Sequence, residues 1–144
     1  MKTFTLDEAQ ALLPILQALL TRAIEAKQAA TDLQEQMADL VRQIFTNGGM
    51  LVDLGAAQKR KVALEALVQR AKDALQEIDA IGVQVKDLDT GLLDFPFVLE
   101  GETVLLCWKR GEEKIGFWHR VEDGFAGRQP IDPRFKRAAP EKLN

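Results

Sequence analysis

Residues 5–45, TLDEAQALLPILQALLTRAIEAKQAATDLQEQMADLVRQIF, set the architecture of this chain, because their apolar positions recur alternately every three and four residues. This spacing places them along one side of a single long helix, in the pattern of a coiled coil. Thr5 and Glu8 fit a capping box at its start, and Pro14 predicts a kink near Leu12 or Leu13. The predicted seam consists of Ala9, Leu12, Leu16, Leu19, Ala23, Ala26, Ala30, Leu33, Met37, Leu40 and Ile44.

A second helix is predicted over residues 54–81. Asn47-Gly48-Gly49 supplies residues that close a helix C-terminus, residues 50–54 turn the chain, and Asp53 can cap the next helix. Because this connection is short, the two helices should be antiparallel neighbours.

Three further apolar residues widen the stripe beside the main seam: Leu13, Leu20 and Val41. They must cover the sheet, a second subunit or another protein. A homodimer that forms a four-helix bundle is the simplest of these solutions. Charged substitutions at these three positions are therefore predicted to abolish self-association.

The pattern changes to a period of two at Gly82. Short strands are predicted at 83–86, 92–98, 102–109 and 114–120, and the last two form a β-hairpin around 110–113. Pro96 predicts an edge strand or a strand end, and residues 122–130 form an irregular loop. The predicted fold class is α+β, with a long antiparallel helical hairpin (1–81), a small antiparallel β-sheet module at its open end (82–131) and a flexible tail (132–144).

Composition excludes several classes of protein. The chain has 144 residues, of which 47% are hydrophobic and 28% charged, and its formal net charge is −3. This apolar content excludes global disorder, and the charge balance argues against a nucleic-acid partner. One cysteine excludes a disulfide framework and cysteine-rich zinc modules, and one histidine removes most histidine-based metal sites, so we expect no metal or cofactor. The absence of a long apolar run predicts no membrane association and a cytoplasmic location.

The densest group of carboxylates comprises Asp87, Asp89 and Asp94. Its spacing does not fit an EF-hand, because Gly91 stands where an oxygen ligand is needed. Asp89-Thr90-Gly91 also matches the short signature of aspartic proteases, but the chain leaves little room for that fold. A strand-end turn, in which the aspartates accept backbone N–H bonds and Gly91 takes a positive φ, is the favoured interpretation. Asp87 and Asp89 remain catalytic candidates.

His119 is the third catalytic candidate, because it is the one histidine and a nearby carboxylate could orient it as a general base. The chain contains no serine, so a Ser-His-Asp triad is excluded. Cys107 lies in an apolar strand and is expected to be a buried structural cysteine. Cys107 and His119 lie on the two strands of one predicted hairpin, where a chemical site is to be sought together with the Arg128 loop.

The glycine-rich loop 124–130 is the candidate ligand-binding segment. Arg128 could pair with a carboxylate or a phosphate, or could tie the loop to an acidic residue of the sheet. Gln129, Trp108 and Asp94 are the other ligand-binding candidates.

Several stretches of the chain resemble one known family. They are FTLDEA (4–9), KDLDTGLLDFP (86–96), LCWK (106–109), FWH (117–119) and GFAGRQP (124–130). They resemble a bacterial family catalogued as domain of unknown function 2203, and the resemblance extends to about Ile131. It implies a bacterial protein with a helical hairpin joined to a small sheet, and it supplies no activity.

The sequence therefore favours a non-enzymatic interaction or scaffold protein that self-associates through its helical hairpin. The alternative is a small-molecule or anion-binding module, or a weak hydrolase, that uses Asp87, Asp89, His119 and Arg128.

Overall fold

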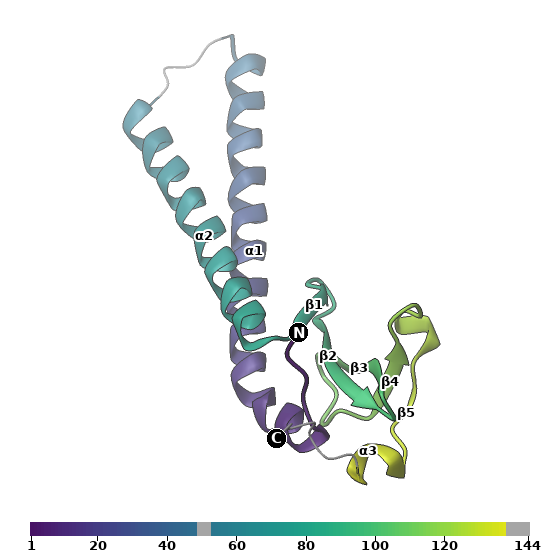
Figure 1. Cartoon of the computed structure of the whole chain (residues 1–144). Coiled ribbons are helices and arrows are strands. Elements are labelled where there is room, and N and C mark those ends of the chain that lie inside the picture. The colour runs from purple at the N-terminus through teal and green to yellow at the C-terminus, as the bar shows by residue number, and fades with distance from the viewer. Residues whose placement is uncertain (49–52, 138–144) are drawn as a thin grey trace. The chain divides into compact units, whose positions relative to one another are not determined.

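A computed structural model describes residues 1–48 and 53–137 (Figure 1). Two long helices, α1 (Leu6–Thr46) and α2 (Leu54–Ile81), precede an antiparallel sheet, which confirms the predicted α+β class. The strands are β1 (Gln84–Asp87), β2 (Leu92–Leu99), β3 (Glu102–Lys109), β4 (Phe117–Arg120) and β5 (Gln129–Pro130). The chain forms two compact units, one of residues 1–20 with 75–144 and the other of residues 21–74. Both long helices pass from one unit into the other.

Local hydrogen bonds explain where the helices begin and end. The Thr5 N–H donates to Glu8 Oε1 at 2.9 Å and the Glu8 N–H donates to Thr5 Oγ1 at 3.1 Å, which confirms the capping box. Helix α1 runs through Pro14 without interruption and is followed by Gly48, whose φ of 68° is favourable only for glycine. Asp53 Oδ1 accepts the Ala56 N–H at 3.0 Å and caps α2 as predicted. The predicted turn residues 49–52 lie outside the described residues.

The apolar seam of α1 changes character along the helix. Leu16 and Leu19 are buried in the first unit, whereas the buried seam positions of the second unit are Ala23, Ala26 and Ala30. Leu13 and Leu20 are buried as well, at 4% and 0% exposure. These two leucines therefore pack within their own chain, so of the three coverings that the sequence allows, neither a second subunit nor another protein is needed at Leu13 and Leu20. Val41 is 52% exposed and stays available.

The sheet is a meander in which each strand pairs with the next along the chain, in the order β1-β2-β3-β4-β5. A two-residue turn joins β2 to β3, where Glu100 and Gly101 have φ values of 52° and 84°. Positive φ at both central residues is typical of the tight hairpin turns whose twist matches that of the strands. The turn fixes the register, in which Leu99 pairs with Glu102 and Asp94 with Cys107.

The prediction that Pro96 marks an edge strand or a strand end is wrong for β2 as a whole. Pro96 lies in the middle of β2, which is an inner strand, and pairs with Leu105. The β1 pairing ends at Asp94, however, and beyond it the Pro96 carbonyl accepts the Phe4 N–H at 2.9 Å. The N–H and C=O groups of one strand residue point to the same side of the strand. The nitrogen of Pro96 therefore faces the side of β2 that β1 does not reach, and its missing N–H removes no hydrogen bond from the sheet.

The end of the described chain is more regular than the sequence predicts. The loop after β4 contains a short 3₁₀ turn, Phe125–Gly127, and strand β5, which pairs with β4. Helix α3 (Pro133–Arg137) occupies the start of the expected tail, and Phe135 on it is buried. The rest of that tail, residues 138–144, lies outside the described residues.

One face of the sheet carries the aromatic core of the first unit. Phe95, Leu106 and Trp118 lie side by side on β2, β3 and β4. The Phe4 ring meets Phe95 edge-on at 5.8 Å, and the Phe135 ring lies 5.3 Å from that of Trp118. Residues from both ends of the described chain therefore cover this face, and the alternating residues of the same strands point to the other face.

The burial of Leu20 predicts a difference between two apolar positions of α1. Leu20→Ala should lower the free energy of unfolding by about 2–5 kcal/mol, because it removes buried methyl groups. Ile15→Ala, at a position 53% exposed, should change it by less than about 0.5 kcal/mol. Urea unfolding followed by circular dichroism measures both, and equal effects would contradict the assignment of Leu20 to the core.

Candidate functional site

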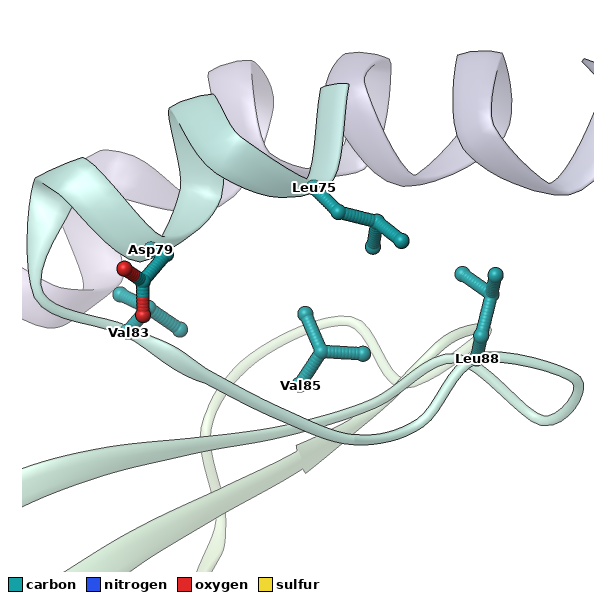
Figure 2. A pocket seen from close by; sticks show the side chains of 5 residues that line it. All are labelled: Leu75, Asp79, Val83, Val85 and Leu88. Atoms are coloured by element: carbon teal, nitrogen blue, oxygen red, sulfur yellow. The ribbon is translucent and has the colours of Figure 1, made fainter. Parts of the chain in front are cut away.

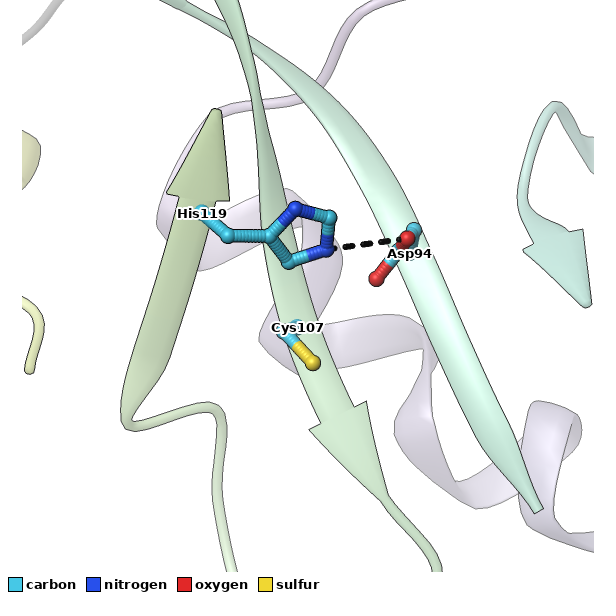
Figure 3. A group of neighbouring side chains, drawn as sticks. All are labelled: Asp94, Cys107 and His119. Atoms are coloured by element: carbon cyan, nitrogen blue, oxygen red, sulfur yellow. Dashed lines mark hydrogen bonds and ion pairs between the residues drawn. The ribbon is translucent and has the colours of Figure 1, made fainter. Parts of the chain in front are cut away.

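Asp94, Cys107 and His119 lie together on the sheet face opposite the aromatic core (Figure 3). Asp94 on β2 pairs directly with Cys107 on β3, and Cys107 pairs with Phe117 on β4. His119 is two residues beyond Phe117 and therefore points to the same face. We call these three residues the polar cluster; all three are buried.

The His119 ring is held at both nitrogens. Its Nδ1 lies 2.8 Å from the Arg120 carbonyl oxygen, and its Nε2 lies 3.1 Å from Asp94 Oδ2. A carbonyl only accepts hydrogen bonds, so Nδ1 carries a proton and donates it. Nε2 is then the atom that faces Asp94, with one proton shared between the two side chains.

Burial dominates the chemistry of Asp94. Its side chain is 1% exposed, and burial raises the pKa of this carboxyl above its ordinary value, while His119 opposes the shift. Oδ1, the second carboxylate oxygen, accepts no hydrogen bond of normal geometry within the described chain, and the Cys107 thiol beside Asp94 is a weak donor that slightly lowers the pKa of the carboxyl. A buried carboxylate oxygen without a partner is unusual in a folded protein, because its desolvation is not offset.

Cys107 is a fully buried thiol. Burial, together with the Asp94 carboxylate, raises the pKa of Cys107 to about 12. A thiol with this pKa is a poor nucleophile at neutral pH. The cluster therefore does not resemble an activated Cys-His pair, and His119 directs Nε2 at Asp94.

The polar cluster combines three kinds of metal ligand. One thiol sulfur, one imidazole nitrogen and one carboxylate oxygen lie within 4.8 Å of one another. In the parts of the chain that the structure describes, this is the one group of three or more such residues. These are the residues that could hold a metal ion.

Arg128 lies in the loop before β5 and is already engaged. Its Nη2 donates to both carboxylate oxygens of Glu112, at 3.1 and 2.8 Å, and its guanidinium lies 3.8 Å from the centre of the Phe117 ring and 4.6 Å from that of Phe125. Of the two roles that the sequence allows for Arg128, the geometry matches the one that ties the loop to an acidic residue.

Asp87, the last residue of β1, and Asp89, in the turn that leads to β2, are both exposed. Asp87 Oδ1 accepts the Asp89 N–H at 3.1 Å, and Gly91 has a φ of 71°. This is the strand-end turn that the sequence favours. The carboxylate beside His119 is that of Asp94.

The two remaining ligand-binding candidates lie apart from the polar cluster. Trp108 is fully buried, its Nε1 donates to the Glu112 carbonyl at 3.0 Å, and by register it points to the aromatic face. Gln129 is exposed on β5, paired with Trp118.

Sequence reasoning missed that Cys107 and Asp94 are neighbours. The signal was Glu100-Gly101 between two apolar runs, because a two-residue turn there pairs positions 94 and 107. His119 could not be placed in the same way, since β4 begins at Phe117 rather than at the predicted Lys114.

An apolar cleft of about 370 Å³ lies between the end of α2 and β1 (Figure 2). Leu75, Val83, Val85 and Leu88 line it, and Asp79 supplies its one carboxylate. Ligand sites usually combine apolar walls with several convergent polar groups. This cleft has a single charged group, and none of the predicted site residues lines it.

Comparisons with known proteins give a family and no activity. A model of the DUF2203 family, described as an uncharacterized conserved protein, matches residues 2–131, which confirms the resemblance seen in the motifs. Neither a curated protein nor a solved structure matches the chain. In the described residues, no helix has a stretch that is long and apolar enough to cross a membrane.

The pKa of Cys107 predicts slow modification in the folded protein. At a pKa of about 12, compared with an ordinary value of 9.0, the thiolate fraction at pH 8 is about a thousandfold lower than in the unfolded chain. The reaction of Cys107 with a thiol-specific disulfide reagent should therefore be at least about tenfold slower in buffer than in denaturant, because the greater nucleophilicity of a high-pKa thiolate offsets only part of this difference and burial limits access. A free small thiol measured in both solvents is the control, and equal rates would show that Cys107 is not buried.

Proposed function

The chain belongs to the DUF2203 family, and we propose that it works as a non-enzymatic interaction module that self-associates through its helical hairpin. One observation carries the proposal: from Thr31 to Asp73, no side chain in the described part of the hairpin is buried. Most helical stability in proteins comes from the packing of an apolar face. A second copy would supply the packing that this stretch does not obtain from its own chain.

The same stretch exposes large apolar side chains. Phe45 is 82% exposed and Val41 is 52% exposed on α1, while Leu54, Val62 and Val68 are exposed on α2. The seam residues Leu33, Met37 and Leu40, which precede Val41 on α1, are half-buried. Large apolar side chains that are exposed on both helices and bordered by charged residues are typical of an interaction site.

Charge favours a second copy as the occupant. Residues 31–46 of α1 contain three acidic residues and one basic residue, whereas residues 54–72 of α2 contain five basic residues and one acidic residue. A two-fold axis that places α1 of one copy against α2 of the other brings opposite charges together twice.

The surface of α2 also suits the approach of a helix. A shallow groove is lined by Ala63, Ala66 and Leu67, and charged residues, among them Arg22 and Arg70, lie along it. Small side chains let helices approach closely, and apolar grooves of this kind accept amphipathic helices. The groove lies entirely within the unit of residues 21–74.

The alternative, a small-molecule or anion-binding module, receives less support. It requires Asp87, Asp89, His119 and Arg128 to act together, but His119 is bonded to Asp94 and Arg128 to Glu112. Asp87 and Asp89 are exposed at the end of β1 and in the turn that follows it. A catalytic site needs its groups around one reacting atom.

Charged substitutions on the hairpin test the proposal. The untagged chain, of 16.1 kDa, should show twice this mass by light scattering at micromolar concentration. The double variant Val41→Glu/Phe45→Glu should weaken the dimer at least tenfold, which corresponds to about 1.4 kcal/mol, because it places charges in the apolar contact. High salt should also weaken the dimer, because it screens the pairing of α1 with α2.

The matched control is Val121→Glu, which charges an apolar residue that is 60% exposed in the other unit. It should leave the dimer intact, and circular dichroism should show that both variants keep their helices. A wild-type mass that stays at 16.1 kDa over the whole concentration range would refute self-association.

A further inference from the structure

We infer that Asp94, Cys107 and His119 form a binding site for a divalent transition-metal ion of the zinc class, coordinated through Oδ1 or Oδ2, Sγ and Nε2. This inference concerns the sheet and does not depend on the proposed function of the hairpin. The sequence suggests no metal, because one cysteine and one histidine exclude the sites built from several of either. A site built from one cysteine, one histidine and one carboxylate is compatible with these counts.

The donor types select the metal. Zinc binds thiolate, imidazole and carboxylate ligands together, whereas magnesium and calcium require oxygen ligands. A sulfur and a nitrogen among three donors therefore disfavour the hard cations.

The positions of the donors fit one ion. The three ligand atoms lie within 4.8 Å of one another, and they are carried by three directly paired strands. Ligand atoms around a tetrahedral zinc ion are about 3.2–3.8 Å apart, given bonds of about 2.0–2.3 Å. The separations therefore exceed the tetrahedral spacing by at most about 1.6 Å, and binding of an ion would require the side chains to close by no more than this.

His119 is oriented as a metal-binding histidine. Its Nδ1 donates to the Arg120 carbonyl at 2.8 Å, and Nε2 points into the polar cluster. In metal sites, the ring nitrogen that does not bind the ion usually donates to a carbonyl or carboxylate in this way, which fixes the tautomer and the ring plane.

An independent observation points to a ligand at Asp94. Its Oδ1 is buried and accepts no hydrogen bond of normal geometry in the described chain. The whole side chain is only 1% exposed. A metal ion would supply the missing partner. A thiolate, a carboxylate and a neutral imidazole also balance the charge of a divalent ion, so the filled site is neutral, as burial requires.

Three protein ligands leave a fourth position. In the described residues, no further histidine, cysteine or carboxylate joins the polar cluster. Zinc sites with three protein ligands complete their coordination with water or another small ligand. The inference extends to binding of the ion and of one such ligand.

Cobalt binding by the untagged full chain tests this site. Co²⁺ is added both by long incubation of the folded protein and by refolding from urea in its presence, so that slow entry into a buried site is not read as absence of binding. We expect one equivalent of Co²⁺, a thiolate-to-cobalt charge-transfer band, and displacement of the cobalt by Zn²⁺. Because Cys107 is the one cysteine of the chain, a thiolate band can come from no other residue.

Variants assign the remaining ligands. Cys107→Ser should abolish the band, and Asp94→Asn and His119→Gln should each weaken binding at least about tenfold, the scale seen even for outer partners of metal ligands. Asp87→Asn and Asp89→Asn, which change exposed carboxylates at the end of β1 and in the turn that follows it, are the matched controls and should bind as the wild type does.

The outcomes separate clearly. A folded wild-type protein that shows no band after either treatment overturns the inference, and so does cobalt that binds without a thiolate band, because that ion lies elsewhere. If Cys107→Ser fails to fold, the wild-type band alone still decides. A band with one equivalent supports the site whether the hairpin dimerises or not.

Discussion

The register between β2 and β3 is the constraint on which the sheet depends. The two-residue turn at Glu100 and Gly101 leaves one pairing for the eight residues of each strand. A slip of one residue would turn Phe95 towards the polar face and Asp94 into the aromatic core. Because both faces of these strands are buried in their middle, such a slip would bury a carboxylate among aromatic rings and lose the packing of Phe4 and Phe135.

The same register brings polar groups together on a buried face of the sheet, where their desolvation is unfavourable. A carboxyl, a thiol and an imidazole occupy adjacent strands, all buried, and one carboxylate oxygen lacks a partner. Replacing buried polar groups by well-packed apolar residues is often neutral or stabilising. Stability alone therefore does not explain why this face carries Asp94 and His119, whereas a bound cation would use both.

Patterns that involve few residues were predictable from the sequence. The single long helix α1, the capping box at Thr5 and the cap at Asp53 depend on neighbours along one helix, and all three agree with the structure. The role of Pro96 was not predictable, because the side of β2 that it faces depends on where β1 ends. Predicting the polar cluster would have required the β2–β3 and the β3–β4 registers together. The second could not be predicted, because β4 is shorter than the strand-like run of its sequence.

In the hairpin, the balance between apolar burial and the entropy lost on ordering the chain differs from that in the sheet. At its base, leucines such as Leu16 and Leu20 are buried, so ordering this part of the helices is offset by apolar burial. Beyond Ala30 the seam still has its three-four spacing, but no described side chain is buried until Ala74. Ordering these residues costs as much entropy as ordering the base, while the burial that offsets it is smaller. A sequence that keeps an apolar seam where its own chain does not cover it is consistent with a helix supplied from outside, and the opposite charges of α1 and α2 make a second copy suitable to supply it.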